Sequence, residues 1–513
     1  MRHFSRLRRL WRLWLPLVPC ALAGQTRASV RRAVGSITPE DLRRHIGVLA
    51  DDSMRGRATP SPELEKVAAY IAGEFKRVGL KPGGERGTYL QRYSIERVQL
   101  VAESSVVSLS GAVTATWRLG TDLQLFGGSP PSGATTGAAL LVTGTPTADG
   151  PLDSAAIAGK VVFVPFDGAP APVVRLVRRL HPAAVIGIGR WPDSIWTMLA
   201  ARQTRIISRN PGQGAPGPPA FITRDMTAQP LLAQAGLDLD SSRAAMTRPV
   251  ALQPLSGVSV RLAMRERVLE RASAPNVIGI LEGSDPKLKN EYVFFTAHMD
   301  HIGTPGAGEG CAARGGDSVC NGADDDASGS AAVIEAANAF SLLTPHPRRS
   351  LVFMTVSGEE RGLWGSSHFV EHPTVPLQDI VADLNTDMVG RNWKDSIAVI
   401  GKEHSDLGAT LNRVAASHPE LHMTPIDDIW PQEGFYFRSD HYNFARKGIP
   451  ILFFFNGTHP DYHEVSDELA KIDAEKESRI VKLDFYLGLE IAGSPERPKW
   501  NPESYKRIVQ GAN

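Results

Sequence analysis

From Asn276 onward, short apolar runs alternate with longer segments that have the apolar spacing of amphipathic helices. The apolar runs read VIGIL, YVFFTA, LVFMTV, IVADLNT, SIAVI and ILFFF, and one helical pattern extends from Ala327 to Leu343. Such alternation predicts a mostly parallel sheet with helices on both faces. In sheets of this kind, sites gather beyond the carboxyl ends of the strands. The sequence therefore predicts an α/β fold and the edge at which a site would lie.

The rest of the chain has different sequence patterns, which predict further structural units besides the α/β domain. At 513 residues, the chain exceeds the length that one hydrophobic core usually supports. Two amphipathic helices are expected between residues 37 and 92, the second from Pro62 to about Val78. Between about 116 and 250, short apolar runs with proline- and glycine-rich connections predict a β-rich module. We divide the chain into a leader (1–23), an N-terminal helical part (24–115), a β-rich insert (116–250), the main α/β domain (251–495) and a C-terminal tail (496–513).

The leader has the layout of an export signal. An arginine-rich segment precedes an apolar run from Leu13 to Ala23, which ends in the small-x-small triplet Ala-Leu-Ala. This run is too short to span a bilayer as a stable helix. We therefore expect a cleaved signal peptide and an exported protein, periplasmic or secreted, with a retained amphipathic anchor as the alternative. Lipid attachment at Cys20 is not expected, because Pro19 fits such a signal poorly.

Charge and cysteine content narrow the class of partners. The formal net charge is +1, so the chain has no electrostatic footprint for nucleic acid or for an anionic membrane. The oligomeric state is left open, a dimer included.

After cleavage of the leader only Cys311 and Cys320 remain, both inside one loop of an exported chain. A local disulfide between them is favoured over free thiols, and the lack of C-x-x-C spacing argues against thiolate metal ligands.

Polar side chains able to do chemistry stand where the apolar runs end. They are His298 and Asp300 after YVFFTA, Glu359 and Glu360 after LVFMTV, Asp387 after IVADLNT, and His463 in the loop after ILFFF. Carboxylates and imidazoles without thiolates form an oxygen and nitrogen ligand set, which suits zinc or a similar divalent ion. Asp300 lies two residues after His298 and would share its side of the strand, where its carboxylate could orient the imidazole.

The stretch NGADDDASGS places three aspartates in a row, Asp324, Asp325 and Asp326, before the helix near Ala327. Their mutual repulsion costs stability unless a cation offsets it. Asp326 could instead cap the helix. Residues 324–335 also fit a calcium-loop pattern, but no helix enters that loop, as such a site requires.

The other candidate ligand residues could also have purely structural roles. His298 could be a hydrogen-bonded core histidine, and His463 could be a surface loop residue. Glu359 and Glu360 could form a solvated helix start favoured by the helix dipole. Asp387 follows an apolar strand, so without a nearby cation its charge would be poorly hydrated.

Six motifs, taken in their order along the chain, together favour metal binding by these residues. They are AHMDHIG, NGADDDASG, SGEERGLWGS, LNTDMVG, RSDHYNFARKGIP and DYHEVSDEL, spread over residues 276–490. This set resembles the co-catalytic di-zinc exopeptidases, metallopeptidase family 28, which include secreted leucyl-type aminopeptidases and glutamate carboxypeptidases. The resemblance implies a zinc-exopeptidase, phosphorylase/hydrolase-like α/β architecture. Residues 37–92 look like the family's N-terminal helices. The insert, through GKVVFV, AAVIGIG and PPAFITRDM, is similar to a protease-associated domain.

The resemblance implies a role for each candidate residue. His298 and Asp387 would bind one zinc ion, Glu360 and His463 the other, and Asp325 would bridge the two. Glu359 would be the general base, Asp300 would orient His298, and Tyr462 would stabilise the tetrahedral intermediate. Asp324 and Asp326 would then shape the turn and cap the helix.

The function implied is that of an exported zinc aminopeptidase, in which a hydroxide held between two Zn²⁺ ions attacks the first peptide bond. A carboxypeptidase or dipeptidase of the same family is the main alternative. Arg438, in GFYFRSD, either holds a substrate carboxylate or forms a structural ion pair. A glutaminyl-cyclase-like acyltransferase would use one zinc ion, and a non-catalytic receptor would be expected to lack ligands or base; the complete residue set argues against both.

Overall fold

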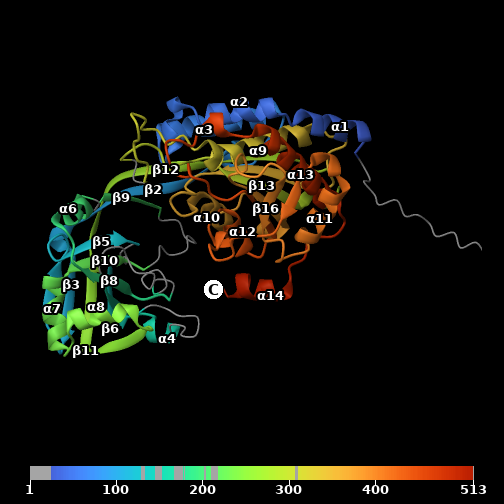
Figure 1. The fold of residues 1–513 in the computed structure, drawn as a ribbon. Coiled ribbons are helices and arrows are strands. Elements are labelled where there is room, and N and C mark those ends of the chain that lie inside the picture. Colours follow the sequence, from blue (N-terminus) through green and yellow to red (C-terminus); the bar gives the residue numbers. More distant parts are fainter. Residues whose placement is uncertain are drawn as a thin grey trace, which may run out of the picture.

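The computed structural model consists of two bodies, each built on its own sheet (Figure 1). It describes residues 25–128, 133–144, 153–166, 177, 180–201, 204–208, 218–306 and 310–511. The predicted leader therefore lies outside the described residues. In the larger body, the strand order of the sheet is β17-β16-β18-β15-β13-β14-β12-β2-β9, with β1 (Lys81–Pro82) beside β12.

Four parallel strands form the centre of the larger sheet: β13 (Tyr292–His298), β14 (Ser350–Val356), β15 (Ile380–Thr386) and β18 (Ile451–Phe455). Alternate side chains enter two separate cores, because successive residues of a strand point to opposite faces. On β13, Val293 and Phe295 pack into one core and Phe294 into the other. Burial of both faces explains why these strands are continuous apolar runs.

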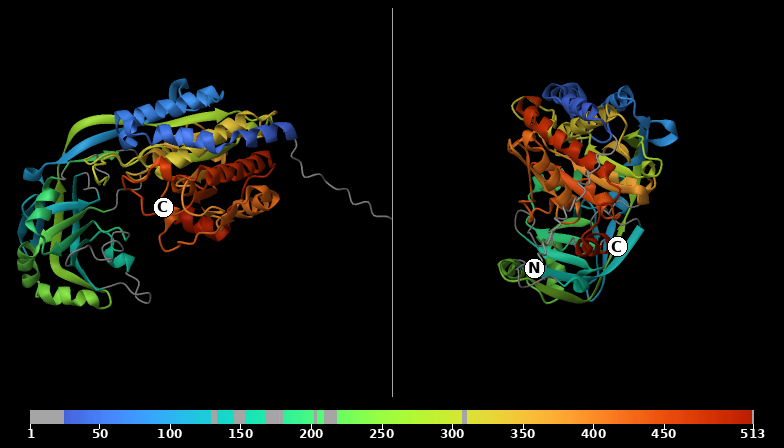
Figure 2. Two further views of the ribbon diagram at one scale, coloured as in Figure 1. Left: turned by 45° about the horizontal axis from the view of Figure 1, so that its top comes forward. Right: turned by 90° about the vertical axis from the view of Figure 1, so that its right-hand side faces the viewer.

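Helices cover both faces of this sheet. One face is covered by helices from both ends of the chain, which Figure 2 shows in two further views. They are α1 (Arg27–Ser36), α2 (Pro39–Leu49), α3 (Pro62–Arg77), α9 (Gly329–Ser341), α11 (Leu407–Ser417) and α13 (Ala474–Gly493). The other face is covered by α10 (Trp364–Glu371) and α12 (His441–Ala445). The helix predicted from Pro62 is α3, whose N-terminus is capped by the Ser61 hydroxyl, which accepts from the Leu64 N–H at 3.0 Å.

The large sheet is less parallel than the sequence predicted. The strand that contains VIGIL, β12 (Glu266–Leu281), runs antiparallel to β14, and β16 (Ser396–Ile400) runs antiparallel to β18. The chain reaches β12 directly from the second body, with no crossover helix to return it in the parallel direction. Among the described residues of this sheet, parallel pairing is therefore confined to the four central strands and to β16 with the short β17 (Thr424–Ile426).

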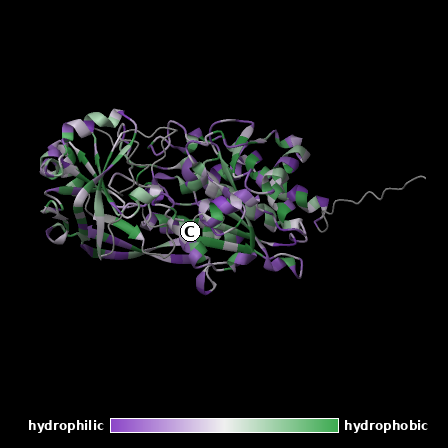
Figure 3. Ribbon diagram, turned by 90° about the horizontal axis from the view of Figure 1, so that it is seen from below, coloured by the Kyte–Doolittle hydropathy of each residue, from purple (hydrophilic) through white to green (hydrophobic). Residues whose placement is uncertain are grey.

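Within the described residues, the second body contains an eight-stranded sheet in the order β4-β3-β11-β6-β7-β8-β10-β5. Here β4 is Ala115–Arg118, β5 is Leu123–Gly127 and β6 is Gly133–Thr143. The three motifs overlap three strands that lie side by side and parallel. GKVVFV overlaps β7 (Val161–Pro165), AAVIGIG overlaps β8 (Ala184–Gly189) and PPAFITRDM overlaps β10 (Ala220–Arg224). The sheet also includes β3 (Val106–Gly111) and β11 (Ala251–Met264), so it extends beyond residues 116–250 on both sides. Figure 3 shows hydrophobic residues along the strands of both bodies.

The two bodies are joined through strands. β2 (Leu90–Leu100) and β12 are long antiparallel partners that run from the larger body toward the second. β9 (Thr204–Ser208), from the insert's part of the sequence, pairs with β2 and so belongs to the larger sheet. Within the described ranges, no helix combines the length and the apolar character that a bilayer crossing requires.

Candidate metal centre

The candidate side chains meet at the carboxyl ends of the parallel strands. His298 is the last residue of β13, Asp387 follows β15, and Glu359 and Glu360 follow β14 after a two-residue turn. His463 comes from the loop after β18, and Asp325 from the turn that leads into α9. Because adjacent parallel strands end at the same edge, segments far apart in the sequence reach one site.

Asp325 lies at the centre of the site, between two groups of side chains. Its Oδ1 is 3.3 Å from His298 Nε2, and that nitrogen is 3.6 Å from Asp387 Oδ1. Its Oδ2 is 3.2 Å from His463 Nε2, which also lies 3.2 Å from Glu360 Oε2. The structure thus brings all five predicted ligands together and gives each group one oxygen of the shared aspartate.

The donor atoms fit a pair of divalent cations. Asp387 Oδ1, Glu360 Oε1 and His463 Nε2 are buried and make no hydrogen bond of ordinary geometry within the described residues. Buried polar atoms are rarely left without partners, because their desolvation is costly. Ligand atoms about 2.0–2.1 Å from a tetrahedral zinc ion lie about 3.3 Å apart, close to the nitrogen–oxygen separations found here.

Asp326 also lies near His298 and Asp387, but its oxygens are already used. Asp326 Oδ2 accepts from the backbone N–H of His298 at 3.1 Å. Asp326 Oδ1 accepts from the N–H groups of Gly329, at the start of α9, and Met388, at 2.9 and 3.1 Å. Asp326 therefore holds three backbone segments together and caps the helix, which leaves Asp325 as the carboxylate facing both groups.

Asp324 is likewise engaged outside the two groups. Its Oδ1 accepts from the N–H of Gly390, and its Oδ2 lies 3.2 Å from Nε2 of buried His459. Asp467 accepts from the backbone N–H groups of both Asp324 and Asp325 at 3.1 Å. The three adjacent aspartates thus point in different directions.

The orientation of His298 depends mainly on a backbone group. Its Nδ1 lies 3.1 Å from the carbonyl oxygen of Asp300, while the Asp300 carboxylate is farther away, at 3.7 Å. That carboxylate accepts from the Thr59 hydroxyl at 2.8 Å and from the Glu359 N–H at 3.3 Å. An N–H on Nδ1 pointing at the carbonyl leaves Nε2 unprotonated toward Asp325. Asp300 therefore orients His298 chiefly through its main chain.

A cavity opens beside the first group. Its lining comprises His298, Asp325, Glu359, Asp387, Met388, Phe435, Arg438, Ser439, Phe453, Phe455, Thr458 and Tyr462. Burial raises the pKa of Glu359 well above its ordinary value, partly opposed by nearby His298. The Tyr462 ring stacks on the His463 imidazole at 3.9 Å between centroids. Both residues thus face the space beside the candidate metal positions.

Arg438 lies at the rim of this cavity. Its side chain is 47% exposed, and its guanidinium covers the Phe435 ring at 4.7 Å. Its guanidinium lies 4.0 Å from the Glu433 carboxylate, which is too long for a tight ion pair. Arg438 is therefore held mainly by the aromatic ring.

Two buried residues of the site were not anticipated. His301 lies in the second group, with Nδ1 2.8 Å from Glu360 Oε1 and 3.7 Å from Asp325 Oδ2. The signal was present in AHMDHIG, which contains a second histidine three residues after the first. Arg57, also fully buried, donates to several main-chain carbonyls of the site loops, and its position gave no such signal.

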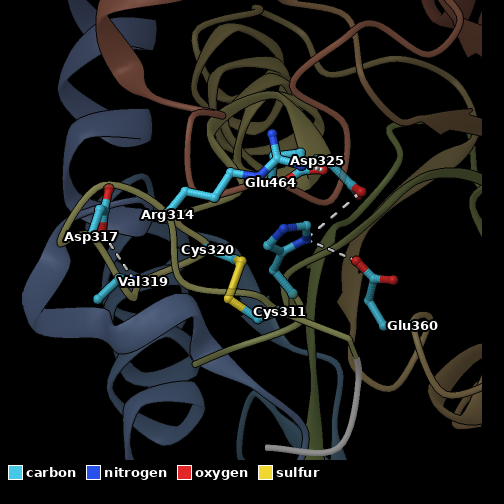
Figure 4. The surroundings of a disulfide bond; sticks show 9 residues. Cys311, Arg314, Asp317, Val319, Cys320, Asp325, Glu360 and Glu464 are labelled. Carbon is cyan, nitrogen blue, oxygen red and sulfur yellow. Dashed lines mark hydrogen bonds and ion pairs between the residues drawn. A yellow bond between two sulfur atoms is a disulfide. The ribbon is translucent and has the colours of Figure 1, made fainter. Parts of the chain in front are cut away.

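Cys311 and Cys320 form a disulfide next to the second group. Both cysteines pack with Ile302 and Val465, residues adjacent or close to His301 and His463. Figure 4 shows the disulfide with Asp325 and Glu360 nearby. The disulfide thus belongs to the support of the second group.

Parallel strands that end in two carboxylate–imidazole groups sharing one aspartate define a class of α/β proteins suited to hold a pair of divalent ions. Within that class, residues 276–487 match the sequence model of Peptidase family M28. This match confirms the resemblance of the six motifs to that family.

Individual relatives agree. A probable leucine aminopeptidase of Arthroderma benhamiae is 29% identical over 222 residues, which cover 42% of this chain and 55% of that protein. Aminopeptidase YwaD of Bacillus subtilis is 24% identical over 244 residues, covering 46% of this chain and 49% of that protein. The matches thus span about half the length of these curated relatives. The aminopeptidase structure from Aneurinibacillus sp. strain AM-1 aligns over 92% of this chain and 98% of its own, at 20% identity and a TM-score of 0.52, and so shares the fold.

Proposed function

We propose that this chain is an exported aminopeptidase that uses two zinc ions to release amino-terminal residues from peptides. The observation that carries the proposal is the position of Asp325, whose two oxygens face two separate ligand groups. His298 and Asp387 would complete one site, and Glu360 and His463 the other. The names of the relatives support an aminopeptidase rather than another peptidase class.

The chain's own residues would perform the proton transfers. Two divalent ions bound here would polarise the scissile carbonyl and acidify a water molecule. Glu359 lines the same cavity as His298 and Asp325, so its carboxylate would accept the proton of the attacking water and deliver it to the leaving nitrogen. The Tyr462 phenol, placed beside His463, would donate to the carbonyl oxygen as negative charge develops there.

The cavity walls support an apolar first residue in the substrate. Met388, Phe435, Phe453 and Phe455 line the cavity and offer mainly hydrocarbon and ring surface. A leucine- or phenylalanine-like side chain would lose its hydration there without stranding a polar group. Aminoacyl-nitroanilides with these side chains are therefore expected to be better substrates than those with acidic side chains.

A carboxypeptidase is the second candidate, because Arg438 at the cavity rim could hold a substrate carboxylate. The deciding experiment compares aminoacyl-nitroanilides with peptides ending in glutamate, each with and without a chelator. Arg438→Ala should leave nitroanilide cleavage within about threefold of wild type. The matched control is Arg413→Ala, because Arg413 is an exposed arginine on α11 that pairs with Glu490. Chelator-sensitive release of the carboxyl-terminal residue, lost only in Arg438→Ala, would establish the alternative.

The second body and the leader complete the proposal. The parallel arrangement of β7, β8 and β10 supports assigning a protease-associated fold to the second body. An experimental structure with another strand order there would contradict this assignment.

Export is proposed from the leader sequence, with cleavage after Ala23. Amino-terminal sequencing of protein recovered from the periplasm or medium tests it, and recovery of an intact leader would refute it. Peptide substrates are the partners proposed, with no nucleic acid.

A further inference from the structure

The second ligand group contains a further histidine, His301, besides Asp325, Glu360 and His463. His301 is fully buried, and its Nδ1 lies 2.8 Å from Glu360 Oε1 and 3.7 Å from Asp325 Oδ2. Its ring meets the His463 ring edge-on, at 5.7 Å between centroids. The imidazole thus faces the same two carboxylates that His463 faces.

The short contact with Glu360 is not an ordinary hydrogen bond. Neither nitrogen of His301 makes a hydrogen bond within the described part of the chain, and Glu360 Oε1 makes none either. Because the two atoms are only 2.8 Å apart, it is the angle at Nδ1, and not the distance, that departs from hydrogen-bond geometry. A buried imidazole that makes no hydrogen bond is costly, and an unprotonated Nδ1 is a good metal ligand.

The main chain around His301 is shaped to admit its ring. Gly322 has φ +58°, and a Cβ there would lie 2.5 Å from two carbon atoms of the His301 ring. A residue other than glycine would therefore displace the imidazole. Arg57 adds rigidity, because Nε donates to the Met299 carbonyl at 2.9 Å and one terminal nitrogen to the Gly322 carbonyl at 2.7 Å. One guanidinium thus joins the turn that carries His301 to the loop that carries Asp325.

We propose that His301 Nδ1 is an additional ligand of the second metal position, alongside Asp325, Glu360 and His463. This inference rests on the proposed two-metal function. The second position would then have four protein ligands, the number found in closed structural zinc sites. The first, with His298, Asp325 and Asp387, would have three and keep a place for water or substrate. The second ion would thus mainly hold the loops together, and the first would stay accessible to water or substrate.

Zinc titration of the metal-free protein tests the assignment. Wild type should show two binding steps. In His301→Ala and His301→Asn, the affinity of one step should fall by about 100-fold or more while the other changes little. The asparagine variant would place an amide donor near the position of Nδ1, so recovery of wild-type affinity by asparagine but not alanine would indicate a hydrogen-bonding role and overturn the proposal. His404→Gln is the control, because His404 is buried and bonds Ser504 away from the site.

X-ray absorption of the zinc-loaded wild type gives a second measurement that needs no variant. Three histidines for two zinc ions support the proposal, and two histidines refute it. Unchanged affinities in both variants, with wild type still binding two ions and cleaving peptides, would also refute the role of His301 and leave the proposed function standing. Failure of wild type to bind zinc at all would refute both.

Discussion

Arg57 donates a hydrogen bond to the main-chain carbonyl of Asp325, 3.2 Å away, from a fully buried position. The same guanidinium reaches the carbonyls of Met299 and Gly322 and lies near those of Leu49 and Asn321. Arginine can satisfy several carbonyls at once because its five N–H donors form a fixed planar fork. Asp325 is thus held through its backbone as well as through any bound cation.

Arg57→Lys is expected to destabilise the protein although the charge is kept. Lysine would leave several buried carbonyls without donors, at about 1–3 kcal/mol for each. We expect a loss of at least about 3 kcal/mol in the free energy of unfolding and weaker binding of both zinc ions. Urea denaturation of the metal-free protein, followed by zinc titration, measures each effect. Arg77→Lys, at an exposed pair with Glu74 on α3, is the control and should change stability by less than about 0.5 kcal/mol.

Glu359→Gln should abolish turnover while metal binding persists. The amide cannot accept the proton, and a general base typically contributes about 10²- to 10⁴-fold in rate. We expect kcat for an aminoacyl-nitroanilide to fall by at least about 10²-fold with zinc content unchanged. Steady-state kinetics and elemental analysis of the same preparation test this. A variant that keeps its turnover would remove Glu359 from its assigned role.

Removal of metal should lower thermal stability as well as activity. Without cations, Asp325, Asp387 and Glu360 are clustered carboxylates that repel one another. Added zinc stabilises the folded state by about 2.7 kcal/mol when its free concentration is 100 times Kd. Thermal unfolding with chelator, and again after zinc is restored, should show a reversible shift. A melting temperature indifferent to both treatments would contradict the two-metal assignment.

Asp383 should make the protein less stable as pH rises. Burial on β15 raises its pKa from 3.8 to about 8, against the lowering effect of the Thr296 hydroxyl that donates to it at 2.8 Å. Between pH 4 and 8 the folded protein holds a proton that the unfolded chain has released. The free energy of unfolding therefore falls with rising pH, by up to about 1.4 kcal/mol per unit from this group.

Asp383→Asn removes this dependence. The stability of the variant relative to wild type should increase from pH 5 to pH 8, because only wild type must give up the proton. Urea denaturation at several pH values gives the difference. Asp379→Asn, just before β15 and partly exposed, is the control and should show no such trend. A constant difference across this range would mean that Asp383 is already ionised in the folded protein.

Much of this arrangement follows from local sequence. Apolar runs about as long as a strand, alternating with helical patterns, lead to an α/β sheet because both kinds of element must bury apolar faces. His298, Glu360 and Asp387 could be expected to meet because each closely follows a strand, and parallel neighbours end at one edge. For the same reason, Asp325 and His463, in loops at that edge, were within reach.

Other features depend on contacts between segments far apart in the chain. Which of the three adjacent aspartates faces both groups depends on the backbone N–H groups that occupy Asp326 and on the contacts of Asp324. His301 joins the second group only because Gly322 leaves space for its ring, and Arg57 reaches the loops from a segment more than 200 residues away. The antiparallel β12 and the entry of β9 into the larger sheet likewise arise from strand pairing across the chain. Residue type and spacing specify the available chemistry, whereas side-chain direction and long-range packing select which atoms meet.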